Sequence, residues 1–273
     1  MIVFPHAKIN LGLHVTSKRS DGYHNIETVF YPIAWCDIME ILPGEKHTSG
    51  IEVHLSGLPV QGKHADNLCV KAYYLLKNDY PIPALKLYLH KQIPMGAGLG
   101  GGSSDAAAFI KAVNELCSLG MSVPEMQNYA KRLGADCAFF IEGNPVHAIG
   151  RGDEFTSVNV SLAGYLIYVV HPGIHVSTAE AYANVVPEMP SVGIPDILAN
   201  DVSTWKNKLT NDFERSVFSA HPAIATIKQR MYDAGAIYSC MSGSGSAVFG
   251  IFKEEPKALA EFAGMNAWIG VLK

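Results

Sequence analysis

The stretch that decides the fold is Pro94-Met-Gly-Ala-Gly-Leu-Gly-Gly-Gly-Ser-Ser-Asp105, a glycine-rich loop that runs directly into a helical pattern. Glycines let the backbone approach an anion closely, and the free N–H groups at the start of a helix can donate hydrogen bonds to it. We therefore interpret this loop as a phosphate-binding site. The alternative is a flexible surface loop with an ordinary helix cap, which would need fewer glycines than this segment has.

Hydrophobic periodicity on both sides of the loop predicts an α+β fold. Near the N-terminus, Lys8 and Asn10 alternate with apolar residues, which indicates a half-buried strand with both polar side chains on one face. Further strands are expected at 51–55, 85–93 and 165–170 and on both sides of 242–246. Helices are expected at 103–117, 122–133 and 222–234 and near 256–264. The second of these starts with a capping box, Ser122-x-x-Glu125.

Turn-rich sequence at 143–153 predicts a division of the chain into two domains. The expected domains are 1–153, which carries the glycine-rich loop, and 154–273. Within the second, the segment 187–195 contains three prolines and no hydrophobic period, so it is expected to be a loop.

Composition excludes several classes of protein. The chain has 273 residues, of which 48% are hydrophobic and 17% charged, as expected of a folded globular protein. A net charge of -4 and a pI near 6.2 give no basic excess for nucleic acid. The five cysteines never fall in a C-x-x-C spacing, which predicts reduced thiols. Neither a signal peptide nor a membrane span is expected, so the predicted location is the cytoplasm.

The loop does not fit the common nucleotide-binding motifs. Gly96, Gly98 and Gly101 satisfy G-x-G-x-x-G, but no acidic residue follows about 20 positions later at the end of a strand, where a dinucleotide fold needs one. No G-x-x-x-x-G-K-[ST] segment is present, and neither H-R-D nor D-F-G occurs. A P-loop enzyme and a protein kinase are therefore not supported.

Three segments in order resemble the motifs of the GHMP small-molecule kinases: Ala7-Lys-Ile-Asn-Leu11, the loop from Pro94 to Ala106, and Ser242-Gly-Ser-Gly-Ser-Ala247. Three more, Asp21-Gly-Tyr-His24, Gly134-Ala-Asp136 and Asn211-Asp-Phe-Glu214, are similar to members of that family that act on a CDP-linked substrate. The resemblance spans nearly the full chain. It implies two α+β domains with the active site in the cleft between them.

The resemblance also implies roles for individual residues. Lys8 and Asp136 would be the catalytic pair. The ATP-binding residues would be Asn67 and Lys91, near the adenosine, and Pro94, Met95, Gly96, Ala97, Gly98, Leu99, Gly100, Gly101, Gly102, Ser103 and Ser104, at the phosphates. The substrate would meet Asn10, Tyr23, His24, Phe30, Thr178, Tyr182, Gly243, Ser244 and Gly245. The chain departs from the family pattern at Ala97, which argues against a positive φ there, and at Cys137-Ala138.

The implied reaction is ATP-dependent phosphorylation of the 2-hydroxyl of a methylerythritol unit in a CDP-linked substrate, a step toward isoprenoids. A carboxylate can accept the hydroxyl proton, and an ammonium can offset charge on the transferred phosphoryl group. Mg²⁺ is expected because the ATP phosphates need charge compensation, but its ligands are not assigned. Taken singly, Lys8 would more often be a solvated edge charge and Asp136 a turn residue.

Three other functions stay open at this point. The chain could be another GHMP kinase that acts on a sugar, mevalonate or homoserine, a nucleotide-binding module without turnover, or an NAD-binding domain. The segment Asp21-Gly-Tyr-His24 disfavours the first, because an exposed turn with an aromatic face and an imidazole suits a pyrimidine. Retention of both Lys8 and Asp136 disfavours the second. No oligomeric state is predicted.

Overall fold

A computed structural model of the chain describes residues 1–45, 49–60, 62–256 and 262–273. The chain forms two compact units, and each consists of segments that are not continuous in sequence. The first unit comprises Met1–Ala7, Trp35–Met95 and Gly100–Asn144, and the second Lys8–Ala34, Gly96–Leu99 and Pro145–Lys273. This grouping differs from a single division at 153/154, because residues 8–34 pack with the C-terminal part of the chain.

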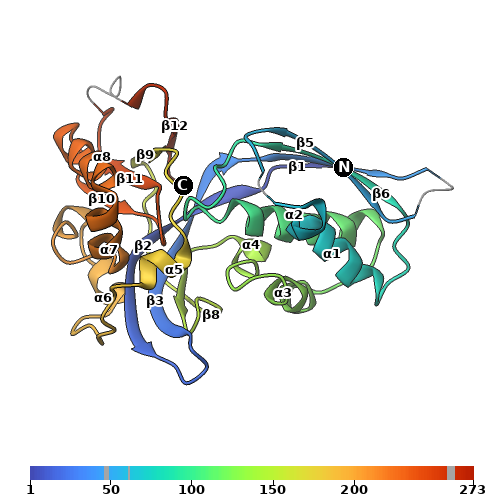
Figure 1. Cartoon of the computed structure of the whole chain (residues 1–273), viewed down its shortest axis with the longest axis horizontal. Coiled ribbons are helices and arrows are strands. Elements are labelled where there is room, and N and C mark those ends of the chain that lie inside the picture. The colour runs from blue at the N-terminus through green and yellow to red at the C-terminus, as the bar shows by residue number, and fades with distance from the viewer. Residues whose placement is uncertain (46–48, 61, 257–261) are drawn as a thin grey trace. The chain divides into compact units, whose positions relative to one another are not determined.

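The first unit is a four-stranded sheet with helices on one face (Figure 1). Its strand order is β1-β4-β6-β5, with β5 parallel to β6 and the other pairs antiparallel. The strands are β1 (Ile2–Val3), β4 (Ile38–Pro43), β5 (Ile51–Gly57) and β6 (Leu85–Lys91). The helices are η1 (His64–Asp66), α1 (Leu68–Lys77), α2 (Gly101–Leu116), α3 (Val123–Lys131) and α4 (Phe139–Glu142).

Helix α2 is the central helix of the first unit and packs against α1, α3 and α4. Its buried face includes Phe109, Ile110 and Val113, each 0% exposed. Burial of side chains of this size stabilises a fold by roughly 1.5–3 kcal/mol each. Helix α3 starts with the predicted capping box, in which the Ser122 hydroxyl and the Glu125 carboxylate each accept a backbone N–H of the other residue. The predicted positions of both helices are confirmed.

The second unit contains two antiparallel sheets (Figure 1). One has the order β2-β3-β7-β8 and the other β10-β11-β9-β12. The strands are β2 (His6–Lys18), β3 (His24–Cys36), β7 (Val146–Ile149), β8 (Glu154–Ser157), β9 (Leu166–His171), β10 (Tyr238–Met241), β11 (Val248–Phe252) and β12 (Asn266–Val271). The helices are α5 (Thr178–Tyr182), α6 (Ile194–Leu198), η2 (Val202–Thr204), α7 (Phe213–Ala220) and α8 (Pro222–Asp233).

The core of the second unit lies where α7 and α8 meet the sheet that contains β11. Ile224, Ile227 and Met231 of α8 are at most 3% exposed and recur at helical spacing on one face. Edge strand β10 is buried along its whole length.

No helix in the described part of the chain is long and apolar enough to cross a membrane.

Several expectations from the sequence need correction. Strand β2 is buried on both faces rather than half-buried: Lys8 is 5% exposed and Asn10 2%. The reason is that Gly98, Ser242 and Phe30 contact Lys8 and Asn10 and enclose them. The segment 187–195 is a loop only up to Gly193, because α6 begins at Ile194. The helix expected near 256–264 falls mainly on residues 257–261, which lie outside the described residues.

Candidate active site

The glycine-rich loop leads into α2 as the sequence predicts. Gly100 is the residue before the helix and has a left-handed backbone with a φ of 71°. Gly96 and Gly98 also have positive φ, whereas Ala97 does not, as its identity predicts. The first N–H groups of a helix have no carbonyl partner within it, and the helix dipole places partial positive charge beside them. The start of α2 is therefore suited to phosphate oxygens.

Within the second unit, residues 96–99 lie against the second glycine-rich loop, Ser242–Ser246. The Ser242 hydroxyl donates to the Gly98 carbonyl at 2.8 Å, and the Ala247 N–H donates to the Ala97 carbonyl at 3.1 Å. A Cβ added to Gly98 would lie 1.9 Å from the Ser242 carbonyl oxygen. Only glycine fits at this position.

Lys8 and Asn10 meet on one face of β2, as their spacing predicts. The Lys8 ammonium donates to Asn10 Oδ1 at 2.5 Å and to the Gly98 carbonyl at 2.7 Å. It also lies 5.1 Å from the centre of the Phe30 ring, a cation–π distance. The Asn10 backbone N–H donates to the Ser242 hydroxyl oxygen at 3.2 Å. These contacts fix the lysine beside both glycine loops.

A second layer of hydrogen bonds orients Asn10. Its amide nitrogen donates to Thr28 Oγ1 at 2.9 Å, and the Thr28 hydroxyl donates to the Gly12 carbonyl at 2.6 Å. Thr28 is 0% exposed. The amide oxygen of Asn10 is thereby directed at the lysine. Thr28 could not be identified from the sequence, because a threonine inside an apolar strand carries no distinguishing pattern.

Asp136 lies in the turn after α3, in the first unit. Its Oδ1 accepts a hydrogen bond from the Ser103 hydroxyl at 2.6 Å, so the carboxylate is held at the first turn of α2. Burial raises the pKa of the neighbouring Cys137 thiol to about 12, and the negative charge of Asp136 acts in the same direction. Lys8 belongs to the second unit, so its convergence with Asp136 stays a prediction.

A cavity of about 120 Å³ in the first unit brings together four of the residues assigned to ATP: Asn67, Lys91, Met95 and Gly102. Apolar side chains from the sheet, Val53, Leu55 and Leu89, form part of its wall. An apolar wall with a few polar groups is typical of a site for a planar base. Asn67 has a structural role as well, since its side chain caps α1 by accepting the Cys69 N–H at 2.8 Å.

Lys91 forms a buried cluster with two carboxylates that the sequence analysis did not identify. Its ammonium is 0% exposed, pairs with Asp37, and lies 2.6 Å from Asp105 Oδ2. Asp37 Oδ1 also accepts the Ile93 N–H at 2.9 Å. Asp105 Oδ1 is buried without a hydrogen-bond partner in the described structure. Burial is the main cause that raises the pKa of Asp105, to about 7.

This cluster predicts a pH dependence of stability. The folded chain keeps a proton on Asp105 that the unfolded chain releases, so the free energy of unfolding falls as the pH rises from about 4 to about 7. Asp105→Asn removes this titration. We expect the wild type to lose stability relative to the variant across that window, by about 1.4 kcal/mol per pH unit at most. Urea denaturation at several pH values measures the difference, and parallel pH profiles would contradict the assignment.

The residues assigned to the cytidine lie in the second unit. The His24 and Tyr182 rings stack with centroids 4.8 Å apart and an interplanar angle of 19°. Tyr23 is 59% exposed, and the Arg151 guanidinium lies 5.3 Å from its ring centre. Thr178 begins α5, the helix that ends at Tyr182. The Tyr23 ring is thus exposed while the His24 ring packs on Tyr182, and recognition of a pyrimidine by the Asp-Gly-Tyr-His segment stays a prediction.

Phe30 differs from the other residues of this group. It is 4% exposed, and its ring lies under the Lys8 ammonium and meets the Phe155 ring edge-on at 6.1 Å between centroids. Its observed contacts therefore support the lysine rather than form an open stacking surface. Arg151, which the sequence analysis did not select, contributes a cation at the exposed Tyr23 ring instead.

The comparisons with known proteins identify the class. A model of the N-terminal domain of GHMP kinases matches residues 67–144, and a model of the C-terminal domain of GHMP kinases matches residues 194–268. The chain belongs to the GHMP kinases, a family of ATP-dependent small-molecule kinases.

Named relatives and solved structures show which members of this family the chain resembles. A protein of Cytophaga hutchinsonii named "4-diphosphocytidyl-2-C-methyl-D-erythritol kinase" is 53% identical over 264 residues, 96% of each chain. A Bacteroides fragilis protein of the same name is 49% identical over 257 residues, 94% of each chain. A crystal structure of a 4-(cytidine 5'-diphospho)-2C-methyl-D-erythritol kinase matches with a TM-score of 0.83 and 32% identity, covering 100% of this chain and 99% of the other. The Methanococcus jannaschii mevalonate kinase shares only the fold, at 15% identity, a TM-score of 0.72, and coverage of 100% and 98%.

Proposed function

We propose that the chain phosphorylates the 2-hydroxyl of 4-diphosphocytidyl-2-C-methyl-D-erythritol with ATP, a step in isoprenoid precursor biosynthesis. The observation that carries the reaction is the Lys8 ammonium, which is fixed between Asn10 Oδ1 and the Gly98 carbonyl beside two glycine-rich loops. The similarity to kinases named for this substrate, at about half of all positions, supports the choice of substrate.

In the proposed mechanism, the 2-hydroxyl oxygen bonds to the γ-phosphorus while the bond from that phosphorus to the bridging β-oxygen breaks. ADP leaves with the electron pair, and the hydroxyl proton passes to Asp136. The Ser103 hydrogen bond at 2.6 Å orients that carboxylate. Lys8 offsets the negative charge that accumulates around the transferred group, and its fixed contacts mean that little reorganisation is needed.

The proposed reaction also uses Mg²⁺. Ser103 and Asp136 offer a hydroxyl and a carboxylate oxygen in direct contact, which are ligand types that Mg²⁺ prefers. Mg²⁺ binds most often through one or two protein oxygens together with substrate phosphates. The residues therefore fit the ion, which the Ser103 hydroxyl oxygen would hold together with the ATP phosphates, while Asp136 accepts the Ser103 hydrogen bond and stays available to the acceptor hydroxyl. When bound, Mg²⁺ would neutralise charge on the ATP phosphates.

Substrate choice rests on the Tyr23 region. Tyr23→Ala removes an exposed aromatic face that can stack on cytosine, and stacking on a base contributes about 1–3 kcal/mol. We expect the KM for the CDP-linked substrate to rise about 5- to 150-fold while the KM for ATP changes little. Steady-state kinetics with each substrate varied in turn measure both constants.

Tyr74→Ala is the matched control, since Tyr74 is 52% exposed and lies on α1 in the first unit. Its kinetics should equal those of the wild type. Equal losses for both ligands in Tyr23→Ala would indicate general damage to the fold and would remove the basis for assigning cytosine to this residue.

A panel of acceptors tests the proposed function. ADP formation is measured with 4-diphosphocytidyl-2-C-methyl-D-erythritol, mevalonate and homoserine at equal concentrations. We expect turnover with the first only. Turnover with mevalonate or homoserine instead would assign the chain to another activity of the family, and ATP binding without turnover on any acceptor would indicate a nucleotide-binding module.

A further inference from the structure

The segment Asn211-Asp-Phe-Glu214 has no role in the mechanism above, yet it is tied to the strand that carries Lys8. Asn211 forms a parallel bridge with Leu13 of β2. The Leu13 N–H donates to the Thr210 carbonyl, and the Asp212 N–H donates to the Leu13 carbonyl, both at 2.9 Å. The segment is therefore fixed to β2 by its backbone and by the Asp212 carboxylate, which accepts the Val15 N–H at 2.8 Å. The side chains of Asn211 and Glu214, in contrast, bind another part of the chain.

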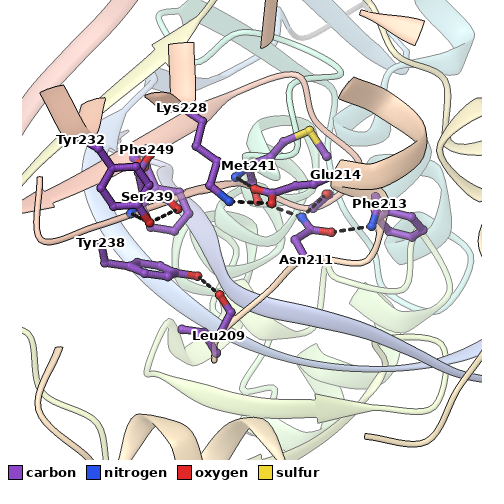
Figure 2. Close-up of polar contacts among 11 residues, drawn as sticks. Leu209, Asn211, Phe213, Glu214, Lys228, Tyr232, Tyr238, Ser239, Met241 and Phe249 are labelled. Atoms are coloured by element: carbon purple, nitrogen blue, oxygen red, sulfur yellow. Dashed lines mark hydrogen bonds and ion pairs between the residues drawn. The ribbon is translucent and has the colours of Figure 1, made fainter. Parts of the chain in front are cut away.

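The Asn211 side chain holds the start of the second glycine loop (Figure 2). Its amide nitrogen donates to the carbonyls of Met241 and Gly243, both at 2.8 Å. Its amide oxygen accepts the Phe213 N–H at 3.0 Å. Asn211 is 3% exposed. An amide is the group that can donate twice and accept once here, whereas aspartate would place a charge against two carbonyl oxygens.

Glu214 binds the same residue, Met241, through its backbone N–H rather than its carbonyl (Figure 2). Its Oε1 accepts the Met241 N–H at 2.9 Å, and its Oε2 accepts from the Lys228 ammonium at 2.6 Å. Burial lowers the pKa of Lys228, but the Glu214 carboxylate outweighs it, so the pKa is raised overall. Lys228 therefore stays protonated beside the Glu214 carboxylate.

The position of Met241 in the sheet explains why side chains perform this task. Met241 is the last residue of β10, and β10 is an edge strand with β11 as its only neighbour in the sheet. An edge strand presents unpaired N–H and C=O groups on its outer side. Asn211 and Glu214 pair with both of these groups of Met241, where a further strand would otherwise lie.

The backbone at Met241 is connected to Lys8 through Ser242 and Gly98. Ser242 follows Met241. Its hydroxyl group donates to the Gly98 carbonyl at 2.8 Å, and its hydroxyl oxygen accepts the Asn10 N–H at 3.2 Å. The same Gly98 carbonyl accepts from the Lys8 ammonium at 2.7 Å. A displacement at Met241 or Gly243 would therefore move groups that fix Lys8 and the two glycine loops.

We propose that Asn211 and Glu214 are positioning residues, which hold Met241–Gly243 so that the Ser242–Ser246 loop is set for phosphoryl transfer. The kinetic part of this proposal rests on the proposed function, whereas the positioning itself does not. Neither residue needs to touch ATP or the acceptor. Their effect should appear mainly in kcat, because an error of about 1 Å in positioning can cost about 100-fold in rate.

Tyr232 provides a matched control on the same strand. Its hydroxyl donates to the Ser239 carbonyl and accepts the Ser239 N–H, both at 3.2 Å. Tyr232 therefore pairs with the outer edge of β10 at a residue that does not adjoin the loop. Tyr232→Phe removes two backbone hydrogen bonds at this edge, the same number that Asn211→Ala removes from the loop carbonyls. A purely structural role for the edge would make the two variants alike.

The kinetic test compares kcat and KM of Asn211→Ala, Glu214→Ala, Glu214→Gln and Tyr232→Phe with the wild type. We expect both alanine variants to lose about 100-fold in kcat with little change in KM for ATP. Glu214→Gln keeps an oxygen acceptor for Met241 and should recover most of the rate lost in Glu214→Ala. Tyr232→Phe should keep wild-type kcat. Equal rate losses in Tyr232→Phe and Asn211→Ala would overturn the proposal.

Hydrogen–deuterium exchange tests the positioning without reference to activity. We expect the backbone amides of 242–246 to exchange faster in Asn211→Ala than in the wild type, and to stay protected in Tyr232→Phe. Unchanged exchange in Asn211→Ala would refute the positioning role, even if the rate falls. A wild-type chain that phosphorylates no acceptor, with exchange as expected, would refute the proposed function and leave the positioning role intact.

Discussion

Asparagine in place of Asp136 should lower kcat by about 10²- to 10⁴-fold, the usual contribution of a positioned acid–base group. The substitution keeps the size of the side chain and its hydrogen bond with Ser103, but removes the negative charge and the basicity. The dissociation constants for ATP and for the acceptor should change little. Rapid-quench measurement of phosphoryl transfer gives the rate of the chemical step, and titration calorimetry gives the affinities.

Asp79→Asn is the matched control, because Asp79 also accepts a hydroxyl hydrogen bond, from Tyr129 at 2.7 Å, and lies in the same unit. It should turn over at the wild-type rate. Near-normal turnover of Asp136→Asn would show that this carboxylate is not the proton acceptor, and the proposed mechanism would fail.

A double variant tests whether Asp136 and Lys8 act together. Lys8→Met alone should also lower kcat, since the charge that accumulates on the transferred phosphoryl group would lose its fixed cation. Groups that act as a unit give losses that are far from additive. We therefore expect the Lys8→Met, Asp136→Asn double variant to be little slower than the slower single variant, and full additivity would argue against convergence at one hydroxyl.

Gly98→Ala should lower kcat/KM by about 10³-fold or more, because a misplaced site of this kind loses both positioning and phosphate contacts. The new Cβ would lie 1.9 Å from the Ser242 carbonyl oxygen. The backbone must move to relieve this clash. That movement takes with it the Gly98 carbonyl, which accepts from both Lys8 and Ser242. Steady-state kinetics measure the loss.

Gly120→Ala separates this clash from backbone strain. Gly120 also has a positive φ, 69° against 77° at Gly98, but a Cβ there would meet nothing within 4 Å. The control should cost about 1–2 kcal/mol in stability for the left-handed backbone and leave kcat/KM unchanged. Wild-type kinetics in Gly98→Ala would contradict the close contact between the two loops.

Local signals were sufficient for much of the fold. The capping box at Ser122 and Glu125 fixes the start of α3, and the same-face spacing of Lys8 and Asn10 places the two side chains in contact. Both depend on residues close together in the sequence, so periodicity and propensity could predict them. The start of α2 after Gly100 belongs to the same group.

Features built from distant segments could not be predicted in this way. Asp37 precedes Lys91 by 54 positions, and nothing in its surroundings marks it as the partner of a buried lysine. The burial of Lys8 and Asn10 on β2 depends on contacts with Gly98 and Ser242, far along the chain. For the same reason, the turn-rich sequence near 154 did not predict that residues 8–34 belong to one unit with residues 145–273. Contacts of this kind follow from the tertiary fold rather than from local pattern.

The structure of the product shows whether the ATP γ-phosphate is transferred to the 2-hydroxyl of the CDP-linked substrate. The wild-type protein is incubated with ATP, Mg²⁺ and 4-diphosphocytidyl-2-C-methyl-D-erythritol labelled with ¹³C at C2 of the erythritol, and ³¹P NMR follows the mixture. We predict a new phosphomonoester resonance that couples to the labelled carbon and grows in step with ADP. ADP without this resonance, or a phosphomonoester that shows no coupling to C2, would contradict phosphorylation of the 2-hydroxyl.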